Sequence, residues 1–136
     1  IRSLNSNNNL LNSSCEILFE TDFNPKKQKD FMHNFSSEKF GINYDTGNSA
    51  SLGFSVEEEF QYYYNYIKNI HIKDRKKSLP TTKLGNGDFN FKYFFDYLTE
   101  NKYDKNLILQ TARSEANDLD TILYGYKFIR KYANGF

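Results

Sequence analysis

The sequence lacks the features of secreted, membrane-bound and nucleic-acid-binding proteins. Its single cysteine, Cys15, cannot form an internal disulfide bond, so a reducing cytoplasm is the expected location. No apolar run approaches the roughly 20 residues that cross a bilayer, and the Asn- and Ser-rich amino end is unlike a signal peptide. The formal net charge of +1 gives no field that would attract nucleic acid or an anionic membrane. We therefore expect no nucleic-acid partner and no membrane partner.

Methionine is equally scarce. The chain begins with Ile1 and its only methionine is Met32, so we interpret it as a piece of a longer polypeptide. Its 136 residues correspond to about one domain. The hydrophobic share of 38% and the aromatic share of 18% supply enough apolar material for a core, which excludes a disordered or collagen-like chain.

Apolar periodicity alternates four times between strand-like and helix-like runs. The helix-like runs cover about 25–35, 56–67, 91–98 and 119–129, with Pro25 at a first helical position. Asp88 is the expected amino-terminal cap of the third helix, and Asn117 or Asp118 that of the fourth. A Gly- and Ser-rich loop is expected between Asp45 and Ser55. The expected strands lie near 15–20, 41–45, 69–74 and 106–111.

Strands that alternate with helices are typical of parallel βα units, because parallel neighbours need a crossover connection. Four such units fit either a small doubly wound sheet or half of a (β/α)8 TIM barrel, and the missing start favours the half-barrel. We expect an α/β fold with four parallel strands and outer helices. Residues 15–136 would form the half-barrel domain, and residues 1–14 would be the end of a preceding helix or a disordered lead.

Each expected strand carries a polar side chain toward its carboxyl end, where barrel and doubly wound enzymes carry their chemistry. These residues are Glu20, Asp45, His71 and Gln110. Two carboxylates and an imidazole that converge there can bind Mn²⁺, Mg²⁺, Co²⁺ or Zn²⁺. The alternative is that the two acidic residues are caps or turn residues and that the histidine has a structural role.

Further polar residues near the same strand ends are candidates for substrate binding. Asn48 lies in the expected loop, Lys73 and Arg75 begin a basic run after the third strand, and Arg113 follows Gln110. Such cations can hold an anionic substrate group, although a solvated loop is the simpler interpretation of the basic run. The segment Leu84–Asp88 contains a Gly-x-Gly pattern, which we interpret as a turn that ends in a helix cap rather than as a phosphate loop.

Five motifs occur in an order that resembles one family, the xylose isomerase-like barrel family of sugar-phosphate isomerases and epimerases. The resemblance runs from about Cys15 to Tyr132 and is to the carboxyl-terminal half of that barrel. The motifs are Leu18–Asp22, Asn43–Asn48, His71–Arg75, Leu84–Asp88 and Gln110–Arg113.

The resemblance implies a TIM barrel with one divalent cation at its mouth. Glu20, Asp45 and His71 match three of the family's metal ligands, and Gln110 stands where a glutamate is usual. In ketose epimerases of the family, two glutamates exchange the proton next to the carbonyl, one on each face. An amide cannot serve as that base, so Glu20 is the expected catalytic base, and isomerisation fits better than epimerisation.

The resemblance therefore predicts a sugar or sugar-phosphate isomerase/epimerase that acts by metal-assisted proton transfer next to a carbonyl. The alternative is a non-catalytic barrel fragment or carbohydrate-binding remnant, since four strands leave two open sheet edges. The expected partners are a small-molecule sugar or sugar phosphate. The missing amino-terminal half-barrel, or a second copy that associates through the open edges, is the expected protein partner.

Overall fold

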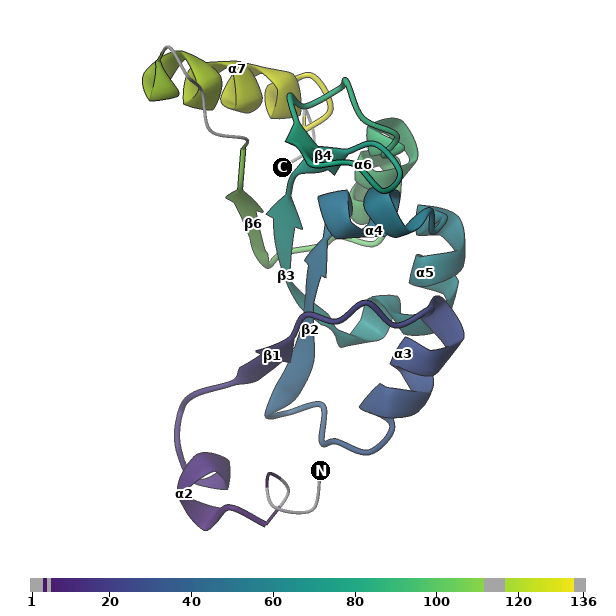
Figure 1. The fold of residues 1–136 in the computed structure, drawn as a ribbon. Helices are drawn as coiled ribbons and strands as arrows, with labels where there is room; N and C mark the ends of the chain where they lie inside the picture. Colours follow the sequence, from purple (N-terminus) through teal and green to yellow (C-terminus); the bar gives the residue numbers. More distant parts are fainter. Residues whose placement is uncertain (1–3, 5, 112–116, 134–136) are drawn as a thin grey trace.

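Four parallel strands form one sheet in the order in which they follow each other along the chain (Figure 1). The computed structural model describes residue 4, residues 6–111 and residues 117–133. Sequential parallel pairing is the arrangement of strands in a βα barrel. The strands are β1 (Ile17–Phe19), β2 (Phe40–Asp45), β3 (Ile67–Ile72) and β6 (Asn106–Leu109).

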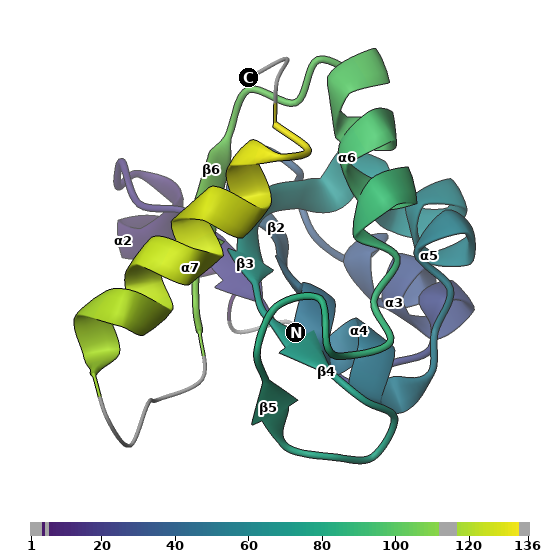
Figure 2. The ribbon, with the colours of Figure 1, turned by 90° about the horizontal axis from the view of Figure 1, so that it is seen from above.

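Helices connect each strand of the four-stranded sheet to the next, and a last helix follows β6. The long helices are α3 (Pro25–Met32), α5 (Val56–Tyr63), α6 (Phe91–Glu100) and α7 (Asp118–Arg130). Figure 2 shows α3, α5 and α6 together on one side of the sheet, with α7 crossing next to β6. The smaller elements are α2 (Asn8–Leu11), α4 (Thr46–Leu52), the 3-10 turn η1 (Tyr64–Tyr66), and the two-stranded ribbon of β4 (Asp74–Arg75) and β5 (Thr81–Thr82).

The two faces of the sheet differ in chemistry. Tyr44 and Ile70 lie on the helix side, where Tyr44 packs 5.4 Å from Phe60 between ring centroids. Successive side chains of a strand alternate between faces, so the next residues, Asp45 and His71, lie on the opposite face. The apolar core therefore holds the helices in place, and the polar residues project from the other face. The expected α/β fold with four parallel strands and outer helices is confirmed.

The structure corrects the expected loop after Asp45. Residues Thr46–Leu52 form α4, because the Asp45 carboxylate accepts a hydrogen bond from the Asn48 amide at 2.8 Å and so caps the helix. Gly53 ends the helix in the left-handed conformation, with φ of 75°. This short helix brings Asn48 back over the carboxyl end of β2.

The expected cap of the third helix is also wrong. Asn90 caps α6 by accepting from the Tyr93 amide at 3.1 Å, while Asp88 accepts from the Lys77 amide at 2.8 Å. Asp88 thus fastens the loop before the helix rather than the helix itself. The strands start and end up to two residues away from the expected positions, because hydrogen bonding rather than the apolar pattern sets their ends.

The Gly-x-Gly segment forms a turn around a buried carboxylate. The amides of Gly85 and Gly87 both donate to Asp74 Oδ2 at 2.8 Å. A Cβ atom at position 87 would lie 2.0 Å from Asp74 Oδ1, so this position requires glycine. Because Asp74 takes these amides, the segment is a turn and its amides do not form a phosphate loop. Across the described residues, no helix is long and apolar enough to cross a membrane.

Candidate metal centre

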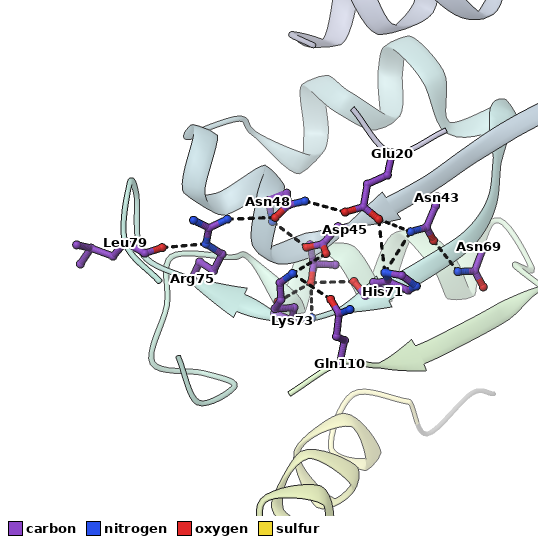
Figure 3. A network of polar contacts seen from close by, with 11 residues as sticks. Glu20, Asn43, Asp45, Asn48, Asn69, His71, Lys73, Arg75, Leu79 and Gln110 are labelled. Atoms are coloured by element: carbon purple, nitrogen blue, oxygen red, sulfur yellow. Dashed lines mark hydrogen bonds and ion pairs between the residues drawn. The ribbon is translucent and has the colours of Figure 1, made fainter. Parts of the chain in front are cut away.

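Three side chains that can bind a metal converge at the carboxyl ends of neighbouring strands. Glu20 directly follows β1, Asp45 ends β2, and His71 lies opposite Asp45 in the register of β2 and β3. One ligand atom of each lies within 4.8 Å of the other two. Figure 3 shows the three side chains turned toward one another on the polar face. The strand order therefore produces a cluster whose members lie far apart in sequence.

The cluster suits a divalent metal ion. Ligand bonds of about 2.0–2.2 Å place the ligand atoms of one ion up to about 4.4 Å apart, so small side-chain rotations would close the observed spacing. His71 Nδ1 already lies 3.6 Å from Glu20 Oε2. The exposed fraction is 39% for the Glu20 side chain and 1% for Asp45, so the cluster opens to solvent on the Glu20 side.

Gln110 joins the cluster through a lysine. The Lys73 ammonium donates to Asp45 Oδ2 at 2.9 Å and to Gln110 Oε1 at 3.0 Å. Lys73 follows β3 and Gln110 follows β6, so this contact links three neighbouring strands (Figure 3). The four predicted ligand residues are thus gathered at one edge of the sheet, with an ammonium group between two of them.

Two of the predicted substrate-binding residues, Asn48 and Arg75, lie on the Glu20 side of the cluster, opposite Lys73. Asn48 donates to Glu20 Oε1 at 2.9 Å, and the Arg75 guanidinium donates to Asn48 Oδ1 at 3.1 Å. Arg75 is held in turn by the carbonyl of Leu79 at 2.8 Å. Asn48 therefore connects Arg75, which the Leu79 carbonyl holds in place, to Glu20, and it restrains the orientation of the Glu20 carboxylate. Arg113 lies outside the described residues.

Two asparagines that sequence reasoning missed complete the polar face. Asn69 donates to Asn43 Oδ1 at 2.5 Å, and Asn43 donates to Glu20 Oε2 at 2.5 Å. Asn43 also lies 3.1 Å from His71 Nδ1. These amides share the strand alternation of Asp45 and His71, two residues earlier in each strand, and that alternation was the signal that could have identified them.

A second missed group lies behind the cluster, on the helix side. The Glu59 carboxylate accepts hydrogen bonds from Tyr44 at 2.7 Å, from Tyr63 at 2.6 Å and from the Ser49 hydroxyl. Burial raises the pKa of Glu59, and burial next to this carboxylate raises the pKa of both tyrosines. A cavity of about 30 Å³ is lined by residues of both groups, among them Asp45 and Glu59. Glu59 thus ties α5 to β2 and α4 directly behind the cluster.

Parallel βα units with ligand-type side chains at their carboxyl ends define a βα-barrel protein. The family model of the xylose isomerase-like TIM barrel matches residues 9–132, and the chain belongs to that family.

Curated relatives and solved structures agree with this assignment. The chain is 29% identical to an inosose dehydratase of Clostridium tetani over 110 residues, which cover 66% of this chain and 37% of that protein. It resembles a xylose isomerase domain protein from Planctomyces limnophilus with a TM-score of 0.69 and 17% identity, covering 87% of this chain and 44% of that one.

A third similar protein is IolI, solved with a binding zinc atom. Its TM-score is 0.66 at 16% identity, and the match covers 81% of this chain and 44% of that one. The chain therefore spans less than half the length of the proteins that it matches. At these identities the solved structures establish the fold alone.

Proposed function

We propose that the complete protein is a sugar-processing enzyme that transfers a proton at a carbon next to a carbonyl, as a sugar or sugar-phosphate isomerase. The observation that carries this proposal is the convergence of Glu20, Asp45 and His71 within 4.8 Å at the carboxyl end of the strands. A polarised carbonyl and a nearby base are the two requirements of such a proton transfer. The residues present can supply both.

The proposed cofactor is a divalent metal ion held by Glu20, Asp45 and His71, with the Gln110 amide oxygen as a fourth ligand. The similar structure of IolI, which contains a binding zinc atom, supports a divalent metal ion as the cofactor of this protein. When bound, such an ion polarises the substrate carbonyl as a Lewis acid. Mn²⁺ and Mg²⁺ suit the oxygen-rich ligands, while Zn²⁺ and Co²⁺ suit the imidazole.

Glu20 is the proposed catalytic base. It is the most exposed acid of the cluster, and Asn43 and Asn48 each donate to one of its oxygens and hold its orientation. Gln110 cannot accept a proton near neutral pH, so one face of the substrate carries a base and the other does not. A single base suffices for aldose–ketose isomerisation through an enediol, whereas inversion of a centre normally needs an acid on each face.

Asn48, Lys73, Arg75 and Arg113 are the proposed substrate anchors. The two described cations lie on either side of the cluster, Lys73 beside Gln110 and Arg75 beside Asn48. An ammonium and a guanidinium at one edge suit a phosphorylated sugar, because charged hydrogen bonds to phosphate are strong.

Dehydration is a second candidate reaction. The curated relatives are named inosose dehydratases, so they act on a cyclic polyhydroxy ketone by removing water. Elimination from such a ketone also begins with removal of the proton next to the carbonyl, and the same base would perform it. The two reactions differ only after this first step, and their products distinguish them.

Proton exchange tests the shared first step. The complete protein, with Mg²⁺, is incubated in D₂O with D-fructose, D-fructose 6-phosphate or scyllo-inosose, and NMR records deuterium entry next to the carbonyl and any product. We expect exchange with at least one of these ketones. Glu20→Gln should slow it by about 10²–10⁴-fold, the usual contribution of a general base.

Glu16→Gln is the matched control, because Glu16 precedes β1, pairs with Lys68 and lies away from the cluster. It should leave exchange unchanged. If Glu20→Gln exchanges as fast as the unaltered protein, Glu20 is not the base. If no ketone exchanges with Mg²⁺, Mn²⁺, Co²⁺ or Zn²⁺, the alternative of a non-catalytic, carbohydrate-binding barrel replaces the enzyme.

A further inference from the structure

Lys73 is confined to the edge of the metal cluster by its own backbone. Its amide donates to Thr46 Oγ1 at 2.9 Å, and the same hydroxyl donates to the Lys73 carbonyl at 2.5 Å. Thr46 is fully buried at the start of α4, so this attachment is shielded from water. The backbone of Lys73 therefore cannot retreat from Asp45 unless α4 moves as well.

The side chain of Lys73 crosses the first turn of α4 at a glycine. A Cβ atom at position 47 would lie 2.8 Å from Lys73 Cγ, so Gly47 leaves the space through which the lysine stem passes. This path leads the ammonium to Asp45 Oδ2 and Gln110 Oε1, its two hydrogen-bond acceptors.

Both oxygens of Asp45 already accept a hydrogen bond in this arrangement. Its Oδ1 accepts from the Asn48 amide and its Oδ2 accepts from Lys73, while 1% of its side chain is exposed. A metal ion on Oδ2 would lie roughly 4 Å from an ammonium on the same oxygen, at which distance a divalent and a monovalent cation repel each other strongly in a desolvated site. Water screens this pair only weakly, because 1% of the Asp45 side chain and 16% of the Lys73 side chain are exposed.

We infer that the Lys73 ammonium and the divalent metal ion exclude each other at Asp45. This inference rests on the proposed metal site and states what must move when that site binds an ion. A metal ion on Asp45 would displace the Lys73 ammonium from Oδ2. Because the Lys73 backbone is hydrogen-bonded to Thr46, only the lysine side chain is free to move, toward the solvent-exposed side of the cluster. The metal ion thereby releases a cation for the anionic group of the substrate, and metal binding prepares the substrate site.

Metal affinity tests the exclusion directly. The complete protein is stripped of metal and titrated with Mn²⁺ in a calorimeter. Lys73→Met removes the competing charge and keeps most of the stem, so it should tighten Mn²⁺ binding by about tenfold or more. Lys76→Met, an exposed residue in the same basic run, removes the same charge and should change the affinity less than about twofold.

The outcomes separate the inference from the proposed function. Equal or weaker Mn²⁺ binding by Lys73→Met overturns the exclusion and leaves the metal site standing. No Mn²⁺ binding by either the unaltered protein or Lys73→Met overturns both.

Chemical labelling of the unaltered protein tests the release without a substitution. Lysines are reductively methylated briefly with and without Mg²⁺, and mass spectrometry compares modification at Lys73 with that at Lys76. The Lys73 side chain is 16% exposed in its contact with Asp45, so its displacement should raise labelling of Lys73 several-fold and leave Lys76 unchanged. Labelling of Lys73 that stays the same or falls when Mg²⁺ binds contradicts the release.

Discussion

Asp45 shows how much a single side chain does at this edge of the sheet. It ends β2, caps α4 through Oδ1 and pairs with Lys73 through Oδ2. Its place at the carboxyl end of a strand could be predicted from the sequence, and so could the places of Glu20 and His71 at the carboxyl ends of theirs. The pairing with Lys73 could not, because the two residues are 28 positions apart and meet only when β2 and β3 align.

Gln110 is the residue at which charge decides both metal binding and the reaction. In Gln110→Glu, a carboxylate would face Lys73 and the cluster, so the ammonium would gain an anionic partner other than Asp45. We expect Mn²⁺ affinity to rise, and epimerised product to increase relative to isomerised product, because an acid then stands on each face. Calorimetry and NMR of the product sugars measure the two effects.

Gln110→Met is the control for this prediction, since it changes the side chain without adding charge. It should give neither effect. A Gln110→Glu protein with unchanged metal affinity and the same product ratio would show that position 110 does not face the reacting carbon.

At the scale of elements, α4 marks the limit of the sequence pattern. Its seven residues, Thr46–Leu52, include glycine, asparagine and two serines, which favour turns over helices, so the pattern predicted a loop. The helix forms because Asp45 caps it and because Ser49 bonds to the buried Glu59. Both contacts form only in the folded structure, so the apolar periodicity of the sequence cannot reveal them. The longer helices were predictable because each has a continuous apolar stripe.

The buried Glu59 predicts how stability depends on pH. Burial raises its pKa in the folded state, so the folded protein binds this proton more tightly than the unfolded chain. The contribution of this bound proton to the free energy of unfolding is therefore fully present below the pKa of Glu59 in the unfolded chain. It is lost as the pH rises through the pKa of Glu59 in the folded protein. A glutamine at this position does not titrate, so the Glu59→Gln variant does not lose this contribution as the pH rises. The free energy of unfolding of Glu59→Gln minus that of the unaltered protein should therefore rise with pH.

Urea unfolding of both proteins at a series of pH values measures this difference. The raised pKa of the buried Asp74 affects both proteins equally and cancels. Glu38→Gln, an exposed glutamate that is not among the groups that shift the pKa of Glu59, is the control and should follow the unaltered protein. Parallel curves for Glu59→Gln and the unaltered protein would show that Glu59 titrates alike in the folded and unfolded states.

At the scale of the molecule, the described residues supply four of the eight βα units of a barrel. Each of the edge strands β1 and β6 pairs on one side only among these residues. The fold could be predicted because each unit carries its own pattern of strand and helix. What pairs with the two edge strands stays a prediction, because the strand and helix patterns of these four units carry no information about it.

An apolar stripe on α7 predicts where that partner binds. Leu119, Ile122, Leu123 and Tyr126 follow helical spacing, and their exposed fractions are 61%, 52%, 44% and 53%. Contiguous exposed apolar surface of this kind typically marks an interface. Together with the open edges of β1 and β6, it should make the 136-residue chain self-associate in solution. Sedimentation velocity across a range of concentrations measures this.

The double variant Leu119→Lys, Leu123→Glu places two opposite charges on the stripe and keeps the net charge, so it should shift the chain toward the monomer. The matched control is Asp120→Lys with Lys127→Glu, which alters charges on the same helix at two exposed polar positions and also keeps the net charge. It should leave association unchanged, because those positions lie outside the stripe. If the unaltered chain sediments as a monomer at every concentration, the stripe and the open edges do not drive association. If both double variants dissociate it equally, the stripe is not the contact.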